Sequence, residues 1–141
     1  MTVFLVFLAA LLLTFAGFAL WVRIAPTDPG VWHVEPASAP DPSTPNFARV
    51  DRMTSLSPDE TAAAITAQAQ AEGARILAGD WPHVTFIART RLMAYPDFVS
   101  IRLNAVDGGT QVIAFSRSRF GYGDAGVNRA RLRRWIGRLP Q

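Results

Sequence analysis

The segment F-V-S-I-R-L-N-A-V-D-G-G-T-Q-V-I-A-F-S-R-S, residues 98–118, decides the fold of this chain. Apolar and polar residues alternate on both sides of D-G-G-T, residues 107–110, and alternation with a period of two is typical of strands. Glycines in the middle of such a segment favour a tight hairpin turn, because they adopt positive φ without steric cost. We therefore predict an antiparallel hairpin with strands over 98–106 and 111–120.

A two-residue loop at Gly108-Gly109 would fix the register of this hairpin. One face would then carry apolar or small side chains, and we expect that face to pack beneath helices. The predicted register pairs Phe98 with Arg119, Ser100 with Arg117, Arg102 with Phe115 and Asn104 with Ile113.

The opposite face of the hairpin combines arginine with aromatic side chains, and both are favoured anchors at protein interfaces. We predict that this face docks a partner protein or the membrane surface. The alternative is that the arginine stems simply cover the phenylalanines. The residues of this candidate interaction face are Phe98, Arg102, Phe115, Arg117 and Arg119.

Two more strands and two helices complete the predicted domain. The strands are expected over 74–77 and 84–90. The S-P-D-E sequence at 57–60 has the pattern of a capping box and begins an alanine-rich helix that runs to Glu72. A last helix is expected over 127–139. The predicted fold is α+β, with a small antiparallel four-stranded sheet and two helices on one face.

The N-terminus is apolar from Val3 to Val22, and a helix of this length spans about 30 Å, the thickness of a bilayer core. Trp21 and Arg23 stand where interfacial anchors belong. A cleaved signal peptide is the alternative, but no basic side chain precedes the apolar run. We expect residues 1–24 to be a retained anchor of a single-pass bacterial inner-membrane protein.

Two observations give opposing predictions of the side of the membrane on which the domain lies. Arg23 favours a cytoplasmic domain by the positive-inside rule. Single N-terminal anchors more often carry periplasmic domains, and we lean toward the periplasm. Residues 25–44 are rich in proline and predict an extended linker between the anchor and an α+β domain over 45–141.

Common catalytic and cofactor patterns are weak in this sequence. G-Y-G-D-A-G, residues 121–126, matches a dinucleotide-binding pattern, but no acidic residue follows it as that site requires. The glycines instead predict a turn, with Asp124 or Asn128 capping the last helix. Cysteine is absent, and His33 and His83 have no acidic residue at a ligand spacing. We expect no cofactor, no metal and no enzymatic activity.

The closing segment, residues 116–131, resembles the signature S-x-S-R-x-G-x-x-D-x-G-x-N-x-x-R of domain-of-unknown-function family 1499. The resemblance extends over most of residues 46–138 and implies no established activity. Phe115 departs from the pattern, because arginine is common there in the family. The residues that match the family pattern are Asn46, Arg91, Asp97, Ser116, Ser118, Arg119, Gly121, Asp124, Gly126, Asn128 and Arg131.

Basic charge is concentrated at the C-terminus, with seven arginines and the single acid Asp124 between Arg117 and Arg138. Such a patch attracts anionic lipid, nucleic acid or an acidic partner, but nucleic acid is not expected because no binding motif is present. We predict a membrane-anchored, non-catalytic interaction or accessory protein associated with a membrane protein complex. The alternative is a binding module for an anionic small molecule or lipid headgroup, using Arg91, Arg117 and Arg119.

Overall fold

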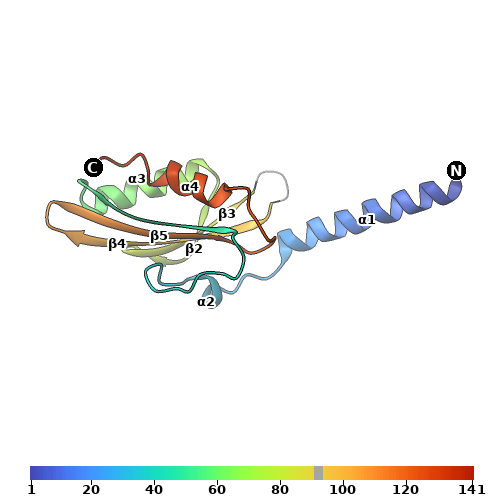
Figure 1. The fold of residues 1–141 in the computed structure, drawn as a ribbon, viewed down its shortest axis with the longest axis horizontal. Coiled ribbons are helices and arrows are strands. Elements are labelled where there is room, and N and C mark those ends of the chain that lie inside the picture. The colour runs from blue at the N-terminus through green and yellow to red at the C-terminus, as the bar shows by residue number, and fades with distance from the viewer. Residues whose placement is uncertain (91–93) are drawn as a thin grey trace.

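The computed structural model describes residues 1–90 and 94–141 of the chain. It consists of one long N-terminal helix that projects from the end of an α+β domain (Figure 1). The helices are α1 (Thr2–Ile24), α2 (Pro29–Trp32), α3 (Pro58–Ala71) and α4 (Val127–Trp135), and the strands are β1 (Phe47–Thr54), β2 (Arg75–Asp80), β3 (His83–Arg89), β4 (Pro96–Val106) and β5 (Gly109–Ser118).

The sheet is antiparallel and has five strands in the order β1-β5-β4-β3-β2. The prediction of four strands was wrong, because β1 was missed. Along β1 the residues on the helix side are Ala48, Val50, Arg52 and Thr54, of which Arg52 and Thr54 bond to carbonyls after α4. These side chains are small or polar, so the strand lacks the apolar alternation that marks the others.

The β4–β5 hairpin has its turn at Asp107-Gly108 rather than at the two glycines. Val106 pairs with Gly109 and Phe98 with Arg117, so the predicted partners were wrong by two residues. Gly108 takes the left-handed conformation, at φ 78°, that this turn requires. Because the shift is an even number of residues, each side chain keeps its predicted face of the sheet.

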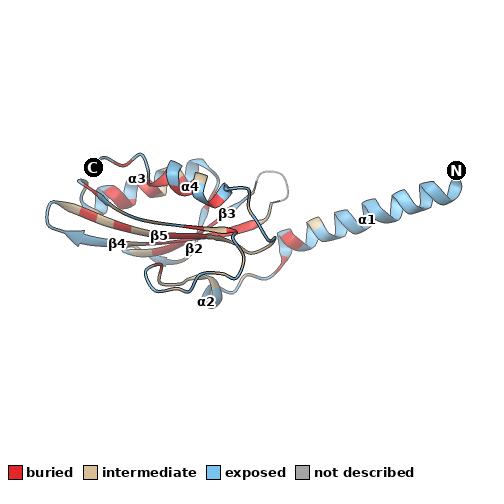
Figure 2. Ribbon diagram, in the orientation of Figure 1, coloured by how far each residue is buried: buried red, intermediate tan, exposed pale blue. Residues whose placement is uncertain are grey.

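The hydrophobic core lies between the sheet and the two helices α3 and α4, which cover one face as predicted (Figure 2). Ile65 of α3 and Trp135 of α4 pack there against Ile101 of β4 and Val112 of β5. Helix α3 begins at the predicted capping box, in which Ser57 and Glu60 bond to each other's backbone N–H groups. The capping box fixes the start of the helix that covers the sheet.

The second face of the sheet is covered by residues 31–42, which we call the strap. The strap runs beneath the sheet on the side opposite α3 and α4 (Figure 1). Trp32 stacks on Phe98 at a centroid distance of 4.1 Å, and Glu35 forms an ion pair with Arg102. The expectation that residues 25–44 form a free linker was therefore wrong, since much of this segment is a layer of the domain.

Helix α1 is apolar, with a mean hydropathy of 2.7, and almost all of its length is exposed (Figure 2). It is long and apolar enough to cross a membrane, a test that signal sequences near an N-terminus also pass. The exposed apolar helix contrasts with the polar exterior expected of a water-soluble element. A possible N-terminal membrane helix is thus a feature of the fold.

Candidate functional site

A buried polar network joins β4, β5 and α4 near the end of the domain from which α1 projects. Arg131 is its centre. The Arg131 Nη2 donates to Asp97 Oδ2 at 2.6 Å, and Nη1 donates to Ser116 Oγ at 3.3 Å and to Asn128 Oδ1 at 3.0 Å. The side chains of Arg131 and Asp97 are only 5% and 1% exposed, so this ion pair lies out of contact with water.

A second layer of the same network holds the loop between β5 and α4. Asn128 Nδ2 donates to the Asn46 carbonyl at 3.0 Å, to Ser118 Oγ at 2.9 Å and to Asp124 Oδ2 at 2.8 Å. Asp124 also accepts from the backbone N–H groups of Gly126 and Asn128, which satisfies donors at the start of α4. Of the two candidate caps, Asp124 is the one that contacts these backbone donors.

The network contains most of the residues that carried the family resemblance. Asn46, Asp97, Ser116, Ser118, Gly121, Asp124, Gly126, Asn128 and Arg131 come together there, and the Asn46 side chain reaches the Gly121 carbonyl. Arg119 lies apart and donates to the Pro26 carbonyl at 2.9 Å. Arg91 lies outside the described residues. The signature residues are thus brought together by the fold although they are spread over some 85 positions, 46 to 131.

Burial and the charge of Arg131 act in opposite directions on the pKa of Asp97. Burial raises the pKa of Asp97, while the adjacent Arg131 guanidinium acts in the opposite direction. Asp97 Oδ1 has no hydrogen-bond partner among the described residues. Loss of either partner would leave a buried charge uncompensated. Three hydrogen bonds, to Asp97, Ser116 and Asn128, position the Arg131 guanidinium.

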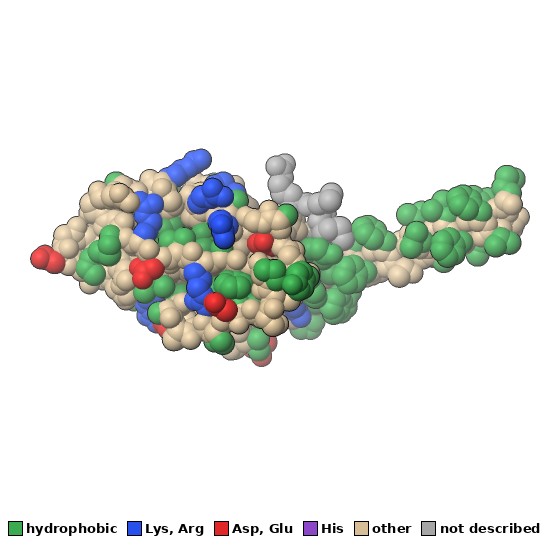
Figure 3. Space-filling view, viewed as in Figure 1, with side chains coloured by type: hydrophobic (Ala, Val, Ile, Leu, Met, Phe, Trp, Pro, Cys, Tyr) green, Lys and Arg blue, Asp and Glu red, His purple; other side chains and the backbone are tan. Residues whose placement is uncertain are grey.

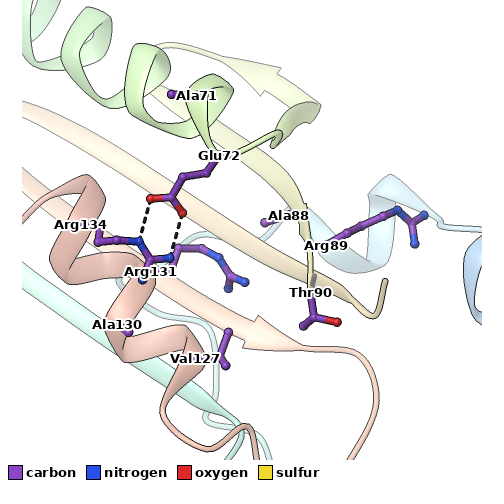
Figure 4. A pocket seen from close by; sticks show the side chains of 9 residues that line it. All are labelled: Ala71, Glu72, Ala88, Arg89, Thr90, Val127, Ala130, Arg131 and Arg134. Carbon is purple, nitrogen blue, oxygen red and sulfur yellow. Dashed lines mark hydrogen bonds and ion pairs between the residues drawn. The ribbon is translucent and has the colours of Figure 1, made fainter. Parts of the chain in front are cut away.

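Beside this network lies a cavity of ≈ 720 Å³ between the end of α3, the end of β3 and the first turns of α4 (Figure 4). This volume is within the range of small-molecule sites. Its apolar walls come from small side chains, and its polar side chains are mainly arginines. The lining residues are Ala71, Glu72, Ala88, Arg89, Thr90, Val127, Ala130, Arg131 and Arg134.

Positive charge dominates the cavity. Arg134 donates from Nε and Nη2 to both oxygens of Glu72, at 2.8 and 2.9 Å, and this lowers the pKa of Glu72 to about 2. Arg89 donates to the carbonyls of Ala94 and Arg23, and burial lowers its pKa. In Figure 4 the Arg89 guanidinium points away from Glu72 and toward α1, so Arg131 and Arg134 are the guanidinium groups that lie with Glu72 on the α4 side of the cavity.

The predicted interaction face is not open. Phe98 is fully buried under Trp32 of the strap, and Arg102 is paired with Glu35. Phe115 is also fully buried, under Arg49, whose guanidinium donates to the Pro36 and Ala39 carbonyls of the strap. Arg117 donates to the Val31 carbonyl at 3.1 Å, and Arg119 bonds to Pro26 as described above. The prediction that this face docks a partner was wrong, because residues 31–42 of the same chain occupy it.

The alternative anion site was expected at Arg91, Arg117 and Arg119. Of these residues, Arg117 and Arg119 are among those that the structure describes. Arg117 and Arg119 line a smaller hollow of ≈ 390 Å³ beside residues 40–44. Sequence reasoning missed Arg89, Arg134 and Glu72, which line the larger cavity. The arginine-rich C-terminus was the available signal, but only the packing of α3 against α4 shows which arginines share a cavity.

The two histidines lie on the strap side of the sheet. Their rings stack at a centroid distance of 4.1 Å, with His33 Nδ1 2.8 Å from Thr85 Oγ1 and His83 Nε2 3.0 Å from the Val34 carbonyl. Within residues 1–90 and 94–141, no group of three or more potential ligands is arranged to hold a metal ion. The histidines join the strap to the sheet.

A family model described as a protein of unknown function, DUF1499, matches residues 28–139. The match begins within the segment before the strap, so the strap belongs to the matched region together with the sheet and helices. No curated protein matches the sequence.

Proposed function

The chain belongs to the DUF1499 family of proteins of unknown function, and we propose that it is a membrane-anchored module that binds an anionic group in the cavity between α3, β3 and α4. The observation that carries this proposal is the charge of the cavity. Arg131 and Arg134 lie in it with Glu72, the one carboxylate among its described lining residues, and Arg89 stands at its edge with its guanidinium turned toward α1. Guanidinium groups are the preferred side chains for phosphate and carboxylate recognition.

The arrangement of these arginines suits a binding site. The buried network holds Arg131, and Glu72 holds Arg134, so neither must be ordered when a ligand arrives. Preorganised cations lose less conformational entropy on binding than free side chains do. Arg89 is held only by carbonyl groups and carries like-charged neighbours, Arg75 and Arg23, whose charges lower its pKa further. An anion at Arg89 would relieve this repulsion.

We further propose that α1 is retained as the membrane anchor. Its exposed apolar surface supports this, because an apolar helix in water exposes surface that a bilayer would cover. A ligand with a phosphate or carboxylate can come from solution or from a lipid headgroup, and both carry the chemistry that the cavity recognises. The periplasmic location of the domain stays a prediction.

A binding role without catalysis is supported by the distribution of titratable groups. His33 and His83 stack on the strap side, whereas the cavity is lined by arginines, one glutamate and Thr90. The role as an accessory protein of a membrane complex also stays a prediction. Co-purification from mild detergent tests it, but the docking surface must lie elsewhere than on the strap-covered face.

Titration of the full-length protein in detergent with inorganic phosphate, monitored by thermal unfolding, tests the binding proposal. We expect the midpoint temperature of unfolding to rise with phosphate and not with chloride at equal ionic strength. Arg89→Gln should abolish most of the rise, because it removes the guanidinium without a carboxylate partner. Arg129→Gln is the matched control, since Arg129 is an exposed residue of α4 outside the cavity lining.

Two outcomes identify the source of the anionic ligand and test whether it binds in the cavity. If vesicles containing anionic lipid stabilise the protein and soluble phosphate does not, the ligand is a headgroup presented by the bilayer. If Arg89→Gln and Arg129→Gln respond to phosphate as the wild type does, the cavity is not the anion site and the proposal is wrong.

A further inference from the structure

The end of the domain beside α1 is attached to that helix by packing rather than by a free linker. Val22 is 1% exposed and Ala25 8% exposed, although the rest of α1 is open. Phe18 meets Tyr95 at a ring-centroid distance of 6.4 Å, and Trp21 meets Phe120 at 5.3 Å. The last turns of α1 therefore lie side by side with the domain.

These contacts set the depth of the domain relative to a bilayer. The apolar stretch of α1 ends near Val22, and Phe18 lies four residues earlier in the sequence. Four helical residues correspond to about 6 Å along the helix axis. When α1 spans a bilayer, Tyr95 in contact with Phe18 lies about one helical turn inside the end of the apolar span. The domain is then too close to the bilayer to stand clear of its headgroups.

The side chains at the end of the domain beside α1 are of the kind found at the headgroup level of a bilayer. Trp21 is 49% exposed, and Phe120 and Tyr95 join it through ring contacts. Tyr122, two residues after Phe120 in the chain, is 77% exposed. Aromatic side chains of this kind gather at membrane interfaces, where one part of the ring system is apolar and the other wet. Figure 3 shows hydrophobic side chains gathered where the domain meets α1 and continuing along the helix.

Cations surround the aromatic cluster. Arg89 donates to the Arg23 carbonyl and Arg119 to the Pro26 carbonyl, and the Arg119 guanidinium lies 5.2 Å from the centroid of the Phe120 ring. Carbonyl partners leave the positive charges of these guanidiniums uncompensated. The acid of the neighbouring loop, Asp124, is engaged by the start of α4. This surface therefore matches the negative charge of phospholipid headgroups.

We propose that this end of the domain is seated in the headgroup region of the bilayer that α1 spans. We call this surface the membrane seat, and it consists of Trp21, Arg23, Arg89, Tyr95, Arg119, Phe120 and Tyr122. The inference rests on the anchoring role proposed for α1 and shares Arg89 with the proposed anion site, so its test uses residues outside the cavity lining. The seat fixes the orientation of the domain, with the β4–β5 hairpin turn at the end that lies farthest from α1 (Figure 1).

The absence of cysteine from the sequence allows a direct test in the full-length chain. Single cysteines are introduced as Leu12→Cys in α1, Tyr122→Cys in the seat and Asp107→Cys in the far hairpin turn. Each variant is labelled with an environment-sensitive fluorophore and reconstituted into phosphatidylcholine–phosphatidylglycerol vesicles. Spin-labelled lipids then quench the fluorophore from the acyl chains or from the headgroups.

We expect acyl-chain quenching at position 12 and headgroup quenching at position 122 that is several-fold stronger than at position 107. Quenching at 12 combined with equal, weak quenching at 122 and 107 overturns the seat and leaves the anchor intact. Absence of quenching at 12 overturns the anchor, and the seat with it. Phosphate binding in the cavity is measured separately with Arg89→Gln, so failure of the seat and failure of the anion site are distinguishable.

A charge reversal provides the second measurement. Arg119→Glu, made in the Tyr122→Cys chain, should reduce headgroup quenching at position 122 by repelling anionic lipid. Arg138→Glu is the matched control, because Arg138 is exposed near the C-terminus at the other end of the domain (Figure 1). Equal quenching in the two variants would show that Arg119 does not contribute to the seat.

Discussion

Trp32 of the strap stacks on Phe98 of β4, with ring centroids 4.1 Å apart and an angle of 20° between the rings. Arg117 completes the stack, with its guanidinium 4.7 Å from the Trp32 ring centroid. A proline-rich segment next to a membrane helix would ordinarily be a spacer. Here its tryptophan closes the second face of the sheet, and the domain therefore begins before β1.

Deletion of the strap should destabilise the domain. We expect a chain of residues 44–141 to have a free energy of unfolding about 3–6 kcal/mol lower than residues 25–141, because Phe98 and Phe115 become exposed. Urea unfolding monitored by tryptophan fluorescence measures the difference. Equal unfolding midpoints for the two chains would show that the strap contributes no stability.

A single substitution should reproduce part of this effect. Trp32→Ala removes the stacking partner of Phe98 and should cost about 3 kcal/mol, the lower end for a large aromatic residue because Trp32 is only partly buried. Trp32→Phe keeps an aromatic ring over Phe98 and serves as the control. The substitution is measured in the full-length chain, and similar losses for both variants would contradict a stacking contribution.

Prediction from the sequence succeeded where local chemistry determines structure. The S-P-D-E capping box begins α3, and strict alternation placed each side chain of the β4–β5 hairpin on its observed face. The exact register was missed because both Asp107-Gly108 and Gly108-Gly109 are acceptable turns, and only pairing with the neighbouring strands distinguishes them. The residues of the loop alone therefore do not determine the register of the hairpin.

The strap and the cavity depend on tertiary structure. Prolines made residues 25–44 resemble a linker, and nothing in their spacing places Trp32 opposite Phe98. The family signature likewise marked Asp97 and Arg131, but their ion pair forms only when α4 packs on the sheet. Arg89 and Glu72 belong to no motif, so their position in the cavity follows from the packing of α3, β3 and α4.

The buried ion pair should be sensitive to removal of one partner. Asp97→Ala leaves Arg131 buried without its carboxylate and should lower the free energy of unfolding by about 3–5 kcal/mol. The double variant Asp97→Ala with Arg131→Gln removes both charges, and its loss should be smaller than the sum of the losses in Asp97→Ala and in Arg131→Gln alone. Additive losses in chemical unfolding experiments would argue against a coupled pair.

The ion pair between Glu72 and Arg134 should make stability fall in acid. The pKa of Glu72 is about 2 in the folded protein and 4.5 ordinarily. Because the folded-state pKa is lowered, the contribution is fully present above pH 4.5 and is lost as the pH falls toward 2. Glu72→Gln should therefore be less stable than the wild type at neutral pH, and the difference should shrink on acidification.

Arg134→Gln provides the matched comparison for this pH dependence. It should remove the same acid-sensitive contribution, and adding Glu72→Gln to it should change little further, since each substitution already breaks the pair. Unfolding free energies are measured across the acid range for all three variants. A difference between wild type and Glu72→Gln that stays constant with pH would contradict the assignment.

The stacked histidines should loosen the strap at mildly acidic pH. Burial lowers the pKa of His33 most, the charges of His83 and Arg102 lower it further, and Glu35 acts in the opposite direction. Because the folded-state pKa lies below the ordinary value of 6.5, the unfolded or detached strap binds protons first. The stability of the attached strap is therefore fully present above pH 6.5 and decreases as the pH falls through this value.

Hydrogen exchange in the full-length protein measures this change. Corrected for intrinsic exchange rates, the amides of residues 31–42 should lose protection between about pH 7.5 and about pH 5.5, on either side of the ordinary histidine pKa. Helix α3, on the other face of the sheet, is the internal reference. His33→Gln should make strap protection much less dependent on pH, since it removes the titrating group, although it also weakens the contact with Thr85. Strap protection that falls with pH equally in wild type and His33→Gln would assign the effect to another group.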